Sequence, residues 1–194
     1  EGGRPSGTGP GGLTGGLEHG LTGRGGILGI IDSGIDYLHP DFRNEDGSTR
    51  ILYLWDQDQE KVYDREDINR ALTAYGEQND RRAALDIVPS VDVSGHGTAA
   101  AAIAAGNGRG SDGVYRGVAY ESELIVVKLG TPPKDSFPRT TQLMEGMDFI
   151  LKRAILLERP VAVNISFGNT YGSHDGTSLL ETFMNEASNY SRNV

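Results

Sequence analysis

The chain has 194 residues, 37% of them hydrophobic. This length suffices for one domain with its own core, and no run of about 18 apolar residues is present that could span a membrane. Cysteine is absent, which excludes disulfides, thiolate catalysis and cysteine-bound zinc. The chain has 27 acidic and 18 basic residues, and the resulting net charge of −9 disfavours nucleic acid or an anionic membrane surface as partner.

Residues 1–22 are rich in glycine and are predicted to form a flexible tail, so the folded domain is expected over residues 23–194. The glycine spacing between Gly20 and Gly26 is similar to that of a phosphate-binding loop. Such a loop needs a strand before the glycines and a helix after them. Here the strand, over residues 27–31, comes after the glycines, which argues against phosphate binding.

Strands and helices are predicted to alternate along the rest of the chain. Short apolar runs predict buried strands over residues 27–31, 51–55, 124–129 and 161–166. Helical spacing of apolar residues, with caps at the ends, predicts helices over residues 64–76, 96–105, 140–157 and from Ser178 onward. Residues 77–95 are polar and are expected at the surface. The alternation favours an α/β fold with a parallel sheet covered by helices on both faces.

Two polar residues occupy positions where such a fold places its chemistry. Asp32 directly follows the first strand, and His96 opens an alanine-rich helix. Polar groups gather at the carboxyl ends of parallel strands, and a nucleophilic hydrolase needs a histidine base with a carboxylate that holds its tautomer. Either residue alone is more often a turn former. Together they indicate a catalytic pair, with the helix N-terminus expected to help keep His96 neutral.

Four segments, in order, resemble motifs of the subtilisin-like serine peptidases, the subtilase family. They are residues 30–35 with 39–42, residues 95–98, residues 117–128 and residues 163–168. The resemblance implies a subtilisin-like fold and a polypeptide substrate. It also implies that Asp32 and His96 are the triad aspartate and histidine, and that Ser166, Phe167 and Gly168 line the substrate cleft.

A narrower resemblance points to one branch of that family. Residues 36–47 and 51–57, together with shorter matches at 66–69, 87–90 and 171–176, are similar to the clostridial Csp spore-germination proteases. This similarity implies an extracytoplasmic or spore-associated protein that acts in sporulation or germination.

The catalytic serine of the family is not matched within the chain. Gly176-Thr177-Ser178-Leu179 imitates the serine motif but comes too early in the family's order, ahead of the strand that leads to the oxyanion-hole asparagine. Ser178 is better explained as part of a helix capping box. We therefore expect an incomplete subtilisin-like domain that is inactive alone and is completed by a C-terminal part, in cis or as a separate chain.

The resemblance also implies a calcium site. Asp41 matches a calcium-binding aspartate of the family, and the loop over residues 107–113 stands where carbonyl ligands are expected. Carboxylate and carbonyl oxygens are the ligands that Ca²⁺ prefers.

Two other classes of function remain open from the sequence. The chain could belong to a noncatalytic member that uses a peptidase-shaped cleft for binding or regulation. It could also be a metal-dependent phosphatase in which Asp32 and Asp36 hold magnesium at a strand end. The phosphatase interpretation leaves the segment over residues 95–98 unexplained.

Overall fold

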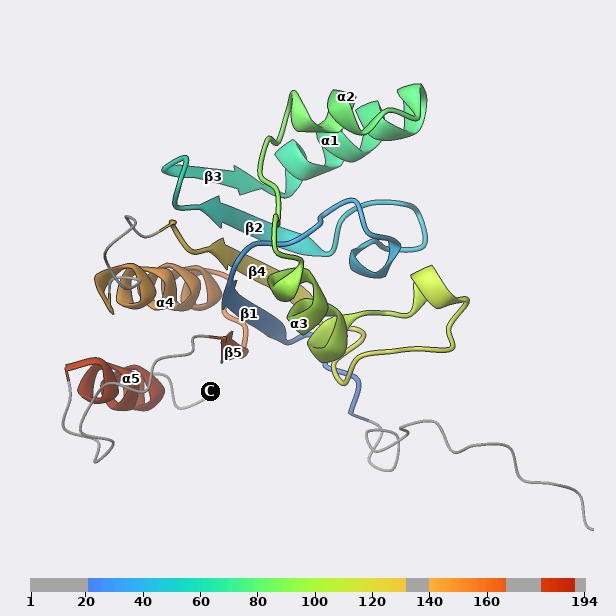
Figure 1. The fold of residues 1–194 in the computed structure, drawn as a ribbon. Helices are drawn as coiled ribbons and strands as arrows, with labels where there is room; N and C mark the ends of the chain where they lie inside the picture. Colours follow the sequence, from blue (N-terminus) through green and yellow to red (C-terminus); the bar gives the residue numbers. More distant parts are fainter. Residues whose placement is uncertain (1–20, 132–139, 167–178, 191–194) are drawn as a thin grey trace, which may run out of the picture.

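A five-stranded sheet with helices on both faces forms the body of the molecule (Figure 1). The computed structural model of the chain describes residues 21–131, 140–166 and 179–190. Along the sheet the strands follow the order β3-β2-β4-β1-β5. Their bounds are β1 Ile27–Asp32, β2 Ile51–Asp56, β3 Lys61–Asp64, β4 Glu123–Lys128 and β5 Val161–Ile165. The α/β class expected from the sequence is confirmed.

Strand β3 makes the sheet mixed rather than purely parallel. Strands β2, β4, β1 and β5 pair in parallel, as expected, whereas β3 pairs antiparallel with β2. Nothing in the sequence pattern marks β3, because it has only four residues and Tyr63 is the one among them that is buried. An antiparallel edge strand on an otherwise parallel sheet is common in α/β folds.

Five helices accompany the sheet in the described ranges. They are α1 Arg65–Gln78, α2 Arg81–Leu85, α3 His96–Ala105, α4 Thr140–Leu156 and α5 Leu179–Tyr190. The expectation that residues 77–95 are a polar surface segment was wrong in part. This segment contains α2, and it buries Ala84, Val88 and Ser90. Isolated buried residues of this kind are too sparse to give a periodic signal.

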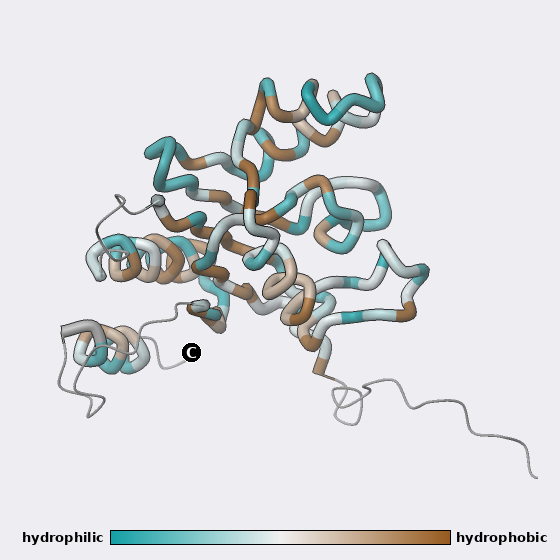
Figure 2. The backbone as a smooth tube through the Cα atoms, viewed as in Figure 1, coloured by the Kyte–Doolittle hydropathy of each residue, from teal (hydrophilic) through white to brown (hydrophobic). Residues whose placement is uncertain are grey.

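The hydrophobic core is divided into two clusters because successive strand residues point to opposite faces. Ile30 belongs to the cluster that packs against α1 and α3, and the next residue, Ile31, belongs to the cluster that packs against α4. Figure 2 shows that the hydrophobic residues concentrate along the central strands and the inner sides of these helices. No helix among the described residues has the length and apolar character needed to cross a membrane.

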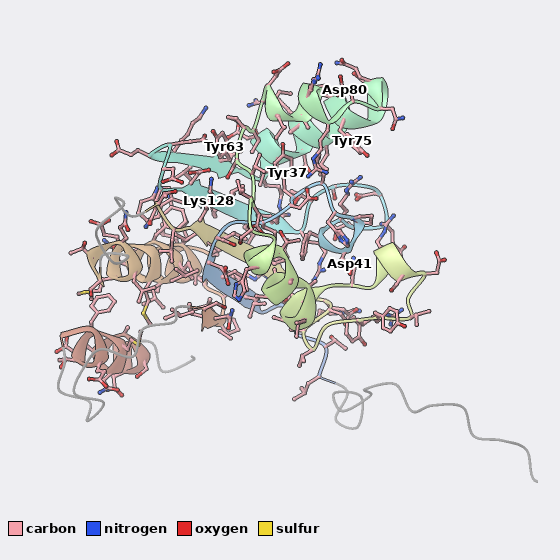
Figure 3. All side chains as sticks on the ribbon, in the orientation of Figure 1. Tyr37, Asp41, Tyr63, Tyr75, Asp80 and Lys128 are labelled. Carbon is pink, nitrogen blue, oxygen red and sulfur yellow. The ribbon has the colours of Figure 1, made fainter. Side chains whose placement is uncertain are left out.

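The strand register brings three segments to one edge of the sheet. Asp32 at the end of β1 pairs with Lys128 at the end of β4. Beyond the end of β5, the N–H of Ser166 donates to the carbonyl oxygen of Ile31 at 3.2 Å. Figure 3 shows Lys128 at this edge and Asp41 on a separate part of the molecule. A site at this edge can therefore draw on β1, β4 and the residue after β5.

Candidate active site

A buried carboxylate and an exposed imidazole meet at this edge. Asp32 is only 3% exposed, whereas the side chain of His96 is 65% exposed. Nδ1 of His96 lies 2.9 Å from one carboxylate oxygen of Asp32 and 3.0 Å from the other. The backbone N–H of Ser33 donates to the Asp32 carboxylate at 2.6 Å. The carboxylate is thus held by the backbone and engages Nδ1, which leaves Nε2 of His96 as the nitrogen able to exchange a proton with a reactant.

Glycines on both sides of His96 allow α3 to approach the end of β1 this closely. Gly95 caps the helix in the left-handed conformation, with φ of 74°, which glycine adopts without strain. A Cβ on Gly97 would overlap the carbonyl oxygen of Gly34 and would lie 3.1 Å from Cβ of Asp32. A side chain at Gly97 would therefore push the helix, and His96 with it, away from Asp32.

The charge of Asp32 dominates the protonation of His96. The pKa of His96 is raised, first by its hydrogen bond to the Asp32 carboxylate, then by the negative charge of Asp32, with a smaller contribution from Asp92. The helix N-terminus was expected to favour the neutral imidazole. The carboxylate outweighs that effect, and the pair stabilises the imidazolium that a general base becomes after it accepts a proton.

Asp92 is a residue of this site that the sequence analysis did not single out. Its carboxylate accepts hydrogen bonds from the hydroxyl of Ser33 at 2.8 Å, the N–H of Gly95 at 3.0 Å and the hydroxyl of Thr98 at 2.6 Å. Burial disfavours its charged form, but the bonds from Thr98, Ser33 and Gly95 outweigh burial, so that the pKa of Asp92 is lowered. Its place just before a helix start suggests a capping role, but nothing in the sequence indicates its contact with Ser33.

A cleft of about 440 Å³ opens beside the pair. Asp32, His96 and Ser166 line it together with Asp58 and Lys128. Nζ of Lys128 lies 3.1 Å from the fully buried carboxylate of Asp56 and 3.8 Å from that of Asp58. Ser166 therefore lies where a cleft-lining residue was expected. Phe167 and Gly168, which were predicted to line the cleft with it, lie outside the described residues.

The surroundings of Asp41 contain protein contacts of their own, and calcium there stays a prediction. One carboxylate oxygen of Asp41 accepts the N–H of Gly110 at 2.6 Å. The guanidinium of Arg50 donates to the backbone oxygens of Asp41 and Ala105 at 2.7 Å each and of Ser122 at 2.6 Å. A permanent cation thus binds carbonyl oxygens close to Asp41, and its charge would weaken the binding of a second cation there. Within the described ranges, no group of three or more His, Asp or Glu side chains could hold a metal, but the predicted calcium site uses one carboxylate with carbonyl oxygens, so that absence does not bear on it.

Asp36 does not join Asp32 as a second magnesium ligand. Its carboxylate forms an ion pair with Arg81 at 2.6 Å and accepts the N–H of Leu38 at 3.2 Å, while the carboxylate of Asp32 faces His96. The two carboxylates are thus engaged by different partners, and the geometry gives the phosphatase interpretation no support.

A mostly parallel sheet here carries a carboxylate–histidine pair at its carboxyl edge, an arrangement that nucleophilic hydrolases require for a histidine base. The chain belongs to the subtilase family, whose model matches residues 23–193. The Csp-type resemblance is also confirmed. The structure of the Clostridium perfringens CspB protease matches with 38% sequence identity and a TM-score of 0.77, over 88% of this chain and 34% of that protein.

More distant structures show the same fold. The S41 psychrophilic protease matches at 23% identity with a TM-score of 0.55, and sphericase matches at 16% identity with a TM-score of 0.54. Each match covers 88% of this chain and 43% of the other. The chain thus spans well under half the length of all three proteins.

Proposed function

We propose that this chain supplies the aspartate and histidine of a serine endopeptidase active site, with Asp32 and His96 in those roles. The observation that carries the proposal is the contact of His96 Nδ1 with both oxygens of the buried Asp32 carboxylate, at 2.9 and 3.0 Å. The subtilase family membership and the similarity to a named protease support it.

The proposed chemistry assigns one step to each group. Nε2 of His96 takes the proton of a serine hydroxyl as its oxygen attacks the carbonyl carbon of a substrate peptide bond. Asp32 stabilises the resulting imidazolium without taking the proton itself. His96 then gives the proton to the departing amine, and water repeats the sequence to release the acyl group from the serine. The cleft beside His96 is the place where the polypeptide would lie.

The serine and the oxyanion donors are proposed to come from a part of the protein outside this chain. In the described ranges, β5 is the last strand of its side of the sheet and pairs with β1 alone. Its outer edge can therefore accept another strand. We propose that a strand of the C-terminal part pairs there, in cis or as a separate chain, and brings the nucleophile to His96. By its similarity to CspB, the complete protein is proposed to act in spore germination, outside the cytoplasm.

Labelling with a fluorophosphonate tests the proposal. We expect the 194-residue chain alone to remain unlabelled, and we expect labelling at a serine outside this sequence once the C-terminal part is present. In that complete protein, Asp32→Asn should slow labelling by roughly 10⁴-fold, whereas Ser178→Ala should leave it unchanged.

Two results would contradict these expectations. Stoichiometric labelling of the isolated chain at Ser178 would make this chain a whole enzyme. A complete protein that binds peptides but reacts with no fluorophosphonate would be a noncatalytic binding module instead.

A further inference from the structure

We propose that Asp92 is a positioning residue that sets the distance between Asp32 and His96 by binding both of the elements that carry them. The proposal rests on the proposed function, because it assigns to Asp92 the alignment of the catalytic pair. Asp92 itself contacts neither Asp32 nor His96 through a hydrogen bond in the described structure, so it would act through its neighbours.

The contacts of Asp92 reach in two directions. Toward β1, its carboxylate accepts the hydroxyl of Ser33, the residue that follows Asp32, at 2.8 Å. Toward α3, it accepts the N–H of Gly95 at 3.0 Å and both the N–H and the hydroxyl of Thr98, at 2.9 and 2.6 Å. One carboxylate therefore joins the residue after Asp32 to the residues on either side of His96.

Ser33 completes the link in the other direction. Its hydroxyl oxygen accepts the N–H of Gly97 at 2.9 Å while the hydroxyl proton is directed to Asp92. The backbone N–H of Ser33 also holds the carboxylate of Asp32 at 2.6 Å. Ser33 is thus bound to Asp32, to Asp92 and to α3 at once, and the position of its hydroxyl depends on Asp92.

This link matters because solvent surrounds much of the imidazole; it acts beside two other contacts of the helix start, from the N–H of Asp36 to the hydroxyl of Thr98 at 2.9 Å and from the hydroxyl of Ser94 to that of Ser33 at 2.8 Å. The side chain of His96 is 65% exposed, so packing does not fix it, and its neighbours Gly95 and Gly97 have no side chains to lock the helix start in place. The pair joins residues that are 64 positions apart in the sequence. Displacements of about 1 Å in a catalytic pair can cost on the order of 100-fold in rate, so a contact that fixes this separation has a functional consequence.

A helix cap alone does not account for the arrangement. Capping α3 requires acceptors for N–H groups of its first turn, which the bonds from Gly95 and Thr98 provide. The hydrogen bond from Ser33 does not contribute to capping; instead it connects the start of α3 to the end of β1. The two interpretations differ in what happens to His96 when the Ser33 bond is removed and the cap is retained.

The test measures the pKa of His96 by NMR in the 194-residue chain, and kcat and KM in the complete protein. The variants are Asp92→Asn, Asp92→Glu and Ser33→Ala. Asp80→Asn is the control, since Asp80 is also an aspartate at a helix start: it is the N-cap residue of α2, accepts the N–H of Arg82 at 2.9 Å, and does not line the cleft. The other charges that face the cleft, those of Asp32, Asp58 and Lys128, stay unchanged in all four.

We expect Asp92→Asn and Ser33→Ala each to lower the pKa of His96 toward its ordinary value and to reduce kcat by roughly 10- to 100-fold with little change in KM. Asp92→Glu keeps the charge but lengthens the side chain, so it should restore neither quantity fully. Asp80→Asn should leave both unchanged.

Two outcomes would overturn the proposal. Loss of stability in Asp92→Asn without any change in the pKa of His96 would make Asp92 a cap only. If Asp92→Glu has the wild-type pKa of His96 and the wild-type kcat, and Ser33→Ala also behaves like the wild type, then Asp92 acts through its charge alone. If Asp92→Asn does not fold, Ser33→Ala, which removes one hydroxyl, decides the question by itself.

The pKa measurement needs no serine. A complete wild-type protein that is unreactive would refute the proposed function while the alignment of the pair by Asp92 is still tested.

Discussion

Replacing Arg50 tests whether its buried guanidinium stabilises the loops around Asp41, as a bound calcium ion would. Arg50 is 3% exposed, and its guanidinium donates to carbonyl oxygens of three separate segments, at Asp41, Ala105 and Ser122. Burial lowers the pKa of Arg50 to about 10, with the nearby charge of Asp41 acting in the opposite direction, so the side chain stays charged at neutral pH. In Arg50→Met, the apolar stem is retained and the donors are lost.

The expected loss of stability follows from the carbonyl oxygens that lose their hydrogen-bond donor in Arg50→Met. The Asp41 oxygen keeps the N–H of Asn107 at 3.2 Å, whereas the oxygens of Ala105 and Ser122 lose the guanidinium. An unsatisfied buried acceptor costs about 1–3 kcal/mol, and removing a buried charge returns part of that cost. We expect a net loss of about 3 kcal/mol in the free energy of unfolding, which corresponds to a fall of about 6–12 °C in Tm for a chain of this size.

Urea and thermal unfolding, followed by circular dichroism, measure this loss. Arg70→Met is the control, because Arg70 forms an exposed ion pair with Asp67 on α1, and such pairs contribute less than about 1 kcal/mol. The wild-type Tm should be the same in EDTA and in millimolar calcium. A loss below about 1 kcal/mol in Arg50→Met, or a clear rise in Tm with calcium, would refute the reasoning.

Two further predictions concern the approach of α3 to β1. In an NMR titration, the pKa of His96 should lie above its ordinary value of about 6.5, and Asp32→Asn should bring it down. Protonated His96 then adds stability below the ordinary pKa that is lost as pH rises through the folded-state pKa, and hydrolysis by the complete protein should increase over that same rise. Gly97→Ala should lower the free energy of unfolding in urea by about 1–3 kcal/mol, because the added Cβ would overlap backbone atoms. The control Gly76→Ala, which has open space around it in α1, should raise that free energy by about 0.5–1 kcal/mol. Equal effects at the two glycines would contradict the close approach of α3 to β1.

The parallel strands and the contact between Asp32 and His96 could be predicted because their signals are local. Apolar runs of five or six residues mark the buried strands, and Asp32 stands at the end of the first of them. Gly-His-Gly-Thr directly before an alanine run marks a tight helix start at His96. Each of these features lies within one short stretch of sequence, so reading the chain in order was enough to find them.

The roles of Asp92 and Arg50 could not be predicted in this way. Asp92 meets Ser33 across 59 positions, and Arg50 meets Ser122 across 72. Neither pair has a periodic or motif signal, since an isolated aspartate before a helix or an isolated arginine before a strand is usual at a protein surface. Calcium at Asp41 stays a prediction from resemblance, which carries a single matching residue and could not show the buried Arg50 beside it.

The contacts that align the pair all lie within this chain. The carboxylate of Asp32 is held by the N–H of Ser33, and Asp92 and Ser33 join β1 to the start of α3. We therefore expect alignment of the proposed base to need no group from the proposed C-terminal part, which would bring the serine and the oxyanion donors to Nε2. Because a preformed base removes one ordering cost from assembly, a separately supplied C-terminal segment that pairs with β5 should restore reactivity without first reorganising His96.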